Sequence, residues 1–124
     1  MEESILTSVK KVVGLASAYT EFDEDILMHI NSTLSTLTQM GVGVDGGLVI
    51  QDATPEWSAF IAEDAELYSM VRSYVSLKVK MLFDPPSTSF TINAFNEQLK
   101  EYEYRMNLVR ESAIIDEYWA AQES

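Results

Sequence analysis

The stretch Met81-Leu82-Phe83-Asp84-Pro85-Pro86 decides how the second half of this 124-residue chain folds. Apolar residues run up to Phe83. The two prolines that follow have no backbone N–H and a fixed φ, so a helix cannot continue through them. Shortly beyond lies Asn93-Ala94-Phe95-Asn96-Glu97-Gln98-Leu99, in which apolar residues recur at helical spacing. The stretch therefore predicts a rigid corner between two amphipathic helices.

The two helices that meet at this corner have different apolar patterns. The helix before it is expected over about Asp64 to Phe83, and its apolar residues surround most of the helical circumference. Such a helix is expected to be central and largely buried. The helix after it is expected over Phe90 to Arg110, with a single stripe at spacings of four, three, four and three residues. This stripe consists of Phe95, Leu99, Tyr102, Met106 and Val109.

Two further helices are expected in the N-terminal half. The first covers about residues 3–13 and ends at Gly14, which can adopt the left-handed conformation that closes a helix. The second begins near Phe22, with Asp23 as its N-cap, and ends at Gly41. Its core-facing stripe consists of Ile26, Leu27, Ile30, Leu34 and Leu37.

Between the second and third helices the pattern changes. From Gly41 to about Pro55, an Asp-Gly-Gly turn separates two runs rich in β-branched residues, which predicts a small β-hairpin or an extended loop. Two strands alone are marginally stable, so a hairpin here would need support from the helices or from a neighbouring subunit. The fold class expected for the whole chain is mainly all-α, a compact bundle of about four helices.

The chain is expected to form one helical domain over residues 1–110, followed by a C-terminal extension over residues 111–124. The extension carries the apolar pairs Ile114-Ile115 and Tyr118-Trp119, which are more than a solvated tail requires. It could prolong the fourth helix, and we interpret it as a docking segment.

Charge and cysteine content narrow the function classes. Twenty acidic and eight basic residues give a net charge of −12, and no Lys or Arg occurs from Val12 to Val71. This balance argues against nucleic-acid binding by neutralisation of phosphates. The chain has no cysteine, which excludes disulfides and thiolate metal ligands. An acidic N-terminus and the lack of a long apolar run predict a cytoplasmic protein without a membrane segment.

No motif indicates catalysis, a metal or a cofactor. His29 is the only histidine, so a zinc site or a histidine-dependent triad would lack partners. The acidic residues at 23–25 and 63–66 suit helix starts, and neither group has the ligand spacing of a calcium loop. The glycines at 41–47 are not followed by the Lys-Ser or Lys-Thr of a phosphate-binding loop. We expect a protein that is not an enzyme.

The corner and the helix after it carry a resemblance. The order and separation of Asp84-Pro85-Pro86, Asn93-Ala94-Phe95 and Glu97-Gln98-Leu99, within the block from Tyr74 to Arg105, are similar to those of the small head-tail connector proteins of tailed bacteriophages. The resemblance extends over most of the chain. The long loop over residues 43–55 and the acidic extension after Arg110 depart from the family pattern.

This resemblance implies a non-enzymatic virion protein of the head-tail interface, assembled in the cytoplasm of the bacterial host. It implies a homo-oligomeric ring, a dodecamer in the virion, which sits beneath the phage portal protein and extends the DNA channel. A stopper or tail-completion protein would bind the other side, and DNA would pass without specific binding. By analogy, the candidate subunit or portal contacts are Val44, Leu48, Ile50, Phe95, Leu99, Tyr102, Tyr118 and Trp119.

A second class of function fits the charge equally well. A small acidic regulatory protein, or a DNA mimic that occupies the nucleic-acid site of a basic partner, would also use the cation-free stretch from Val12 to Val71. Assembly separates the two hypotheses. A connector forms rings or caps portals, whereas a mimic binds one basic partner in a salt-dependent way.

Overall fold

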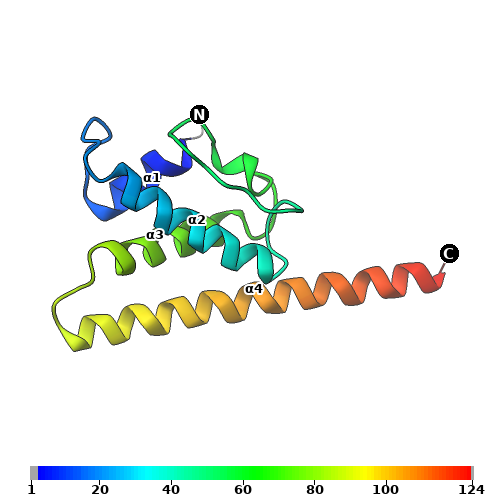
Figure 1. The fold of residues 1–124 in the computed structure, drawn as a ribbon. Coiled ribbons are helices and arrows are strands. Elements are labelled where there is room, and N and C mark those ends of the chain that lie inside the picture. Colours follow the sequence, from blue (N-terminus) through cyan, green and yellow to red (C-terminus); the bar gives the residue numbers. More distant parts are fainter. Residues whose placement is uncertain (1–2, 124) are drawn as a thin grey trace.

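The protein is a small bundle of helices with one very long member. The computed structural model describes residues 3–123, and Figure 1 shows its elements in order. They are α1 (Ile5–Val13), α2 (Asp23–Gln39), the short 3-10 helix η1 (Trp57–Ala59), α3 (Tyr68–Phe83) and α4 (Ser89–Glu123). No β-strand forms among these residues, and one isolated bridge joins Ser4 to Glu56. The predicted four-helix, mainly α bundle is confirmed.

Helix α3 lies at the centre of the bundle, as its apolar circumference predicts. It packs against α1, α2 and α4, and α4 returns alongside it after the proline corner (Figure 1). The helix begins at Tyr68 rather than near Asp64. The preceding residues form turns, in which Ala65 and Leu67 are held by packing against the core. The side chains that α3 buries are Val71, Tyr74, Val75, Ser76 and Val79.

The C-terminal end of α1 is as predicted from the sequence, whereas the N-cap of α2 is a different residue from the predicted one. Gly14 closes α1 in the left-handed conformation, with a φ of 101°. Asp23, predicted as the N-cap of α2, is instead its first helical residue, and Phe22 occupies the cap without a side-chain hydrogen bond. The Asp23 carboxylate is engaged elsewhere because Lys10 of α1 points its buried ammonium group at it, at a distance of 2.8 Å.

The segment between α2 and α3 takes the extended-loop form and not the hairpin form. Its backbone is held by a side chain of α2: the Asn31 amide donates to the Ile50 carbonyl at 3.0 Å and accepts from the Ile50 N–H at 2.8 Å. These two bonds replace those that a partner strand would make. At the end of the loop, η1 places Trp57 in the core, where its ring N–H donates to the Ser8 hydroxyl at 2.7 Å.

Helix α4 is longer than the prediction of Phe90 to Arg110. It runs unbroken for 35 residues from Ser89 to Glu123 and contains neither Gly nor Pro, which gives a rod of about 50 Å. Its C-terminal part projects past the rest of the bundle (Figure 1), and residues 111–122 are all exposed. The expected C-terminal extension is thus the end of α4, and its docking role stays a prediction.

Candidate functional site

The inner face of α4 holds the helix on the bundle. Leu99 and Met106 are buried in the common core, and Phe95, Tyr102 and Val109 of the same stripe are half-buried. The predicted stripe is therefore the packing face of α4. Leu99, at 4% exposure, belongs to the core of the subunit and presents no surface to a partner.

One polar contact joins α3 to α4 within this packing. The hydroxyl of Tyr74, whose ring is completely buried, donates to the Glu103 carboxylate at 2.8 Å. Burial raises the pKa of the Tyr74 hydroxyl far above its usual range, and the hydrogen bond and charge of Glu103 act in the same direction. The phenol therefore remains the proton donor over the whole physiological range.

The outer face of α4 carries a second apolar stripe. Tyr104, Leu108, Ile115 and Trp119, called the outer stripe below, are between 45% and 64% exposed. At 100° per residue they lie roughly opposite Met106, so they point away from α3. Ile114 and Tyr118 flank the stripe and are also exposed. Contiguous exposed apolar residues of this kind mark contact surfaces.

Most residues of the outer stripe were not among the contact residues predicted from the sequence. The prediction included Tyr118 and Trp119, which the structure places in the open on α4, in edge-to-face contact with each other at 5.6 Å between ring centres. Tyr104 and Leu108 were missed, and Ile115 was noted only as part of the suspected docking segment. Their signal was present, since they recur at helical spacing on the side of the helix opposite the packing stripe.

The three loop residues predicted as contacts have different environments. Val44 is exposed and Leu48 is half-buried against the core. Ile50 is 2% exposed and belongs to the core of the subunit, so it presents no surface to a partner. Its neighbour Val49, which the prediction did not include, is 73% exposed.

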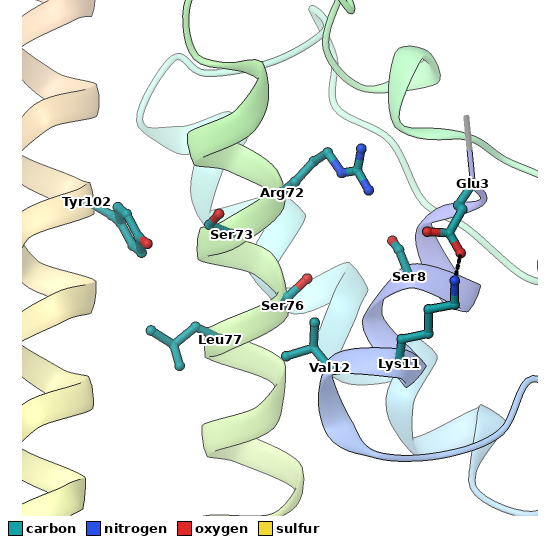
Figure 2. A pocket seen from close by; sticks show the side chains of 9 residues that line it. All are labelled: Glu3, Ser8, Lys11, Val12, Arg72, Ser73, Ser76, Leu77 and Tyr102. Atoms are coloured by element: carbon teal, nitrogen blue, oxygen red, sulfur yellow. Dashed lines mark ion pairs between the residues drawn. The ribbon is translucent and has the colours of Figure 1, made fainter. Parts of the chain in front are cut away.

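An open groove of about 480 Å³ runs along α3, between α1 and α4. Figure 2 shows Ser73, Ser76 and Leu77 of α3 between Tyr102 of α4 and the side chains of α1. Two of the eight basic residues of the chain, Lys11 and Arg72, line this groove. The remaining lining residues are Glu3, Ser8 and Val12.

The two cations of the groove are held differently. The Arg72 guanidinium lies over the rings of Trp57 and Tyr68, at 5.7 and 5.6 Å from their centres, a cation–π arrangement that fixes its position. Lys11 forms an ion pair with Glu3 at 2.6 Å, and both partners are partly or largely exposed. Arg72 is thus a cation held over two aromatic rings, and Lys11 is an exposed cation paired with a carboxylate.

The part of the chain that the structure covers shows no arrangement suited to a metal. Within residues 3–123, no three His, Cys, Asp or Glu side chains come close enough together to hold an ion. Over the same range, no helix combines the length and apolar character that a bilayer crossing needs. The surface features that stand out are the outer stripe, the exposed end of α4 and the groove.

An exposed apolar stripe and an open groove on a helical body are typical of a structural subunit that contacts other proteins. Residues 5–113 match the family model of the phage connector protein. The match includes the proline corner, the packing stripe of α4 and both basic residues of the groove. The chain therefore belongs to the phage connector protein family, and it is a structural connector of a phage virion. No curated protein and no solved structure matched the chain.

Proposed function

We propose that this protein forms a ring at the portal vertex, where it joins the DNA-filled head to the tail and extends the DNA channel. The phage portal protein would bind one side of the ring, and a stopper or tail-completion protein the other. The observation that carries this proposal is the family match over residues 5–113, which spans nearly the whole bundle.

The shape of the subunit supports assembly through rigid contacts. Helix α4 leaves the bundle as a straight extension, and the outer stripe offers large apolar side chains along it. Complete burial of one Leu, Ile or aromatic side chain stabilises a contact by about 1.5–3 kcal/mol. A few such side chains at each of many equivalent contacts suffice to hold a closed ring together.

The charge of the chain supports the passage of DNA. With a net charge of −12 and no cation from Val12 to Val71, the protein repels a phosphate backbone over much of its surface. A channel wall of this kind lets DNA slide without specific binding. We expect no measurable affinity for duplex DNA at physiological salt.

Assembly with the portal tests the proposal. The protein would be analysed by native mass spectrometry and negative-stain microscopy, alone and mixed with the portal encoded in the same genome. A ring in either sample supports the connector function. A monomer that ignores the portal contradicts it and favours the acidic binding module, which would form a tight, salt-sensitive complex with one basic partner.

A further inference from the structure

We propose that the C-terminal arm of α4, residues 111–123, binds in the α3 groove of a second copy of the chain. Lys11 and Arg72 of the groove would face the carboxylates of the arm. The inference rests on the proposed ring, since it identifies the two surfaces that meet where neighbouring subunits join.

Charge complementarity is the first reason. Residues 111–124 contain four of the twenty acidic residues and none of the eight basic ones, so the arm is anionic along its length. The groove brings together two cations on a protein that is otherwise strongly acidic. An anionic segment is therefore attracted to the groove and repelled by most of the remaining surface.

The state of Arg72 is the second reason. Its guanidinium is positioned by the Trp57 and Tyr68 rings, and no carboxylate within residues 3–123 forms an ion pair with it. A carboxylate that arrives can therefore bind a planar, preoriented donor at little entropic cost. The Lys11–Glu3 pair is exposed enough to be exchanged for a new partner, because such pairs contribute little.

Shape is the third reason. The small side chains of Ser73 and Ser76 on α3 let the backbone of a helix approach closely, while Val12, Leu77 and Tyr102 offer apolar contact. The arm has a matching face: Ala113, Asp116, Glu117 and Ala120 recur at helical spacing on one side of α4. Small residues flank the carboxylates on that face, as a helix that lies in a groove requires.

The arm cannot reach the groove of its own subunit. Tyr102 lines the groove, and Asp116 lies 14 residues farther along the same unbroken helix, which places it about 20 Å away. The contact must therefore join two copies. Because arm and groove are different surfaces, the contact is head-to-tail, the type that closes into rings when the rotation fits.

Reversed charges test the contact directly. The groove variant carries Lys11→Glu and Arg72→Glu, and the arm variant carries Asp116→Lys and Glu117→Lys. Each variant alone should associate with itself about 100-fold more weakly than the wild type, because like charges then meet at every contact. An equimolar mixture should regain wild-type assembly, since each arm then finds a groove of opposite charge.

Native mass spectrometry at fixed ionic strength, with and without the portal, reads the result, and circular dichroism verifies that both variants fold. Assembly by either variant alone, or no recovery in the mixture, overturns the arm-in-groove contact. If the arm-in-groove contact is overturned but the wild type forms rings in the same experiment, the proposed connector function still holds. Absence of wild-type assembly even with the portal overturns both.

A cross-link provides a second measurement that does not depend on the portal. Because the chain has no cysteine, Ser73→Cys and Ala120→Cys each introduce a single thiol. Mixed and mildly oxidised, they should form a disulfide-linked heterodimer in large excess over either homodimer. Ser35→Cys, at an exposed position on α2, replaces Ser73→Cys in the control. Equal yields from both mixtures overturn the contact.

Discussion

The Lys10 ammonium group lies 2.8 Å from the Asp23 carboxylate, although Lys10 is only 2% exposed. The same nitrogen also donates to the carbonyl oxygens of Ser17 and Tyr19, at 3.1 and 2.6 Å. One buried cation thus joins α1, the loop after it and the first residue of α2. The connection between the first two helices depends on a charge and not only on apolar packing.

Replacement of this cation should be costly. Lys10→Met keeps the length of the side chain but leaves the Asp23 carboxylate and two carbonyl groups without their donor. We expect the free energy of unfolding to fall by about 3 kcal/mol, because the partly buried Asp23 carboxylate loses its cation and two carbonyl groups lose their donor. Urea denaturation at pH 7 measures the change. Lys11→Met, at the exposed neighbouring position, should cost less than about 1 kcal/mol, and equal costs would contradict the argument.

The Tyr74–Glu103 contact should make stability sensitive to alkaline pH. The pKa of Tyr74 is raised in the folded protein, so its contribution is complete below the ordinary tyrosine pKa of about 10 and is lost as pH rises above that value. Tyr74→Phe should lower the free energy of unfolding by about 1.5–3 kcal/mol at pH 7, since a hydrogen bond to a charged group is lost.

The pH profile distinguishes this explanation from a loss of packing. In urea titrations from pH 7 to 11, the difference between the wild type and Tyr74→Phe should shrink as pH rises. Tyr104 is 64% exposed, so Tyr104→Phe should have the same free energy of unfolding as the wild type at every pH. A difference that stays constant with pH would show that the ring contacts, and not the hydroxyl, account for the effect.

The Asn31 side chain should hold the loop between α2 and α3 in place. Asn31→Ala removes both hydrogen bonds to the Ile50 backbone and leaves a largely buried N–H without an acceptor. We expect a loss of about 2 kcal/mol in stability and faster hydrogen exchange at the Ile50 amide. Ser35→Ala, on the exposed side of α2, is the control. Unchanged exchange at Ile50 would mean that packing alone holds the loop.

The outer stripe should matter for assembly and not for folding. Ile115→Glu combined with Trp119→Glu alters side chains that are 55% and 60% exposed, so the free energy of unfolding should change by less than about 0.5 kcal/mol. Binding to the portal, or ring formation on it, should weaken strongly because apolar contact area is replaced by charge. Native mass spectrometry with the portal measures this.

Phe90 supplies the control for that experiment. It lies at the opposite end of α4, is 83% exposed and is also turned away from the packing stripe. Phe90→Glu should leave assembly intact if the contacts involve the C-terminal part of the helix. A ring that tolerates the Ile115 and Trp119 changes would remove the outer stripe from the interface.

The helices were predictable from sequence because their signals are local. Apolar periodicity located α3 and α4, and the prolines after Asp84 fixed the corner between them. The role of Asp23 was not predictable, because its partner Lys10 belongs to another helix and no local pattern shows that the two meet. For the same reason the glycine-rich loop resembled a hairpin, although a side chain of α2 holds it in an extended form.

The candidate surfaces were only partly predictable. Apolar spacing shows that a residue such as Leu99 faces a neighbour, but not whether that neighbour is its own bundle or another subunit. The groove could not have been found at all, because Lys11 and Arg72 lie far apart in sequence and meet only through the packing of α1 on α3. A family resemblance names a function without locating the surfaces that perform it.

Because α4 is unbroken, a small rotation at its base produces a large displacement at its C-terminal end. With no glycine or proline from Ser89 to Glu123, the rod has no joint, so its tip follows every rotation of its base against α3. A tilt of a few degrees at the base displaces the tip by several ångströms over a rod of about 50 Å. The crossing angle between α3 and α4 would then set the curvature of any closed array, and core substitutions under α4 could alter its copy number.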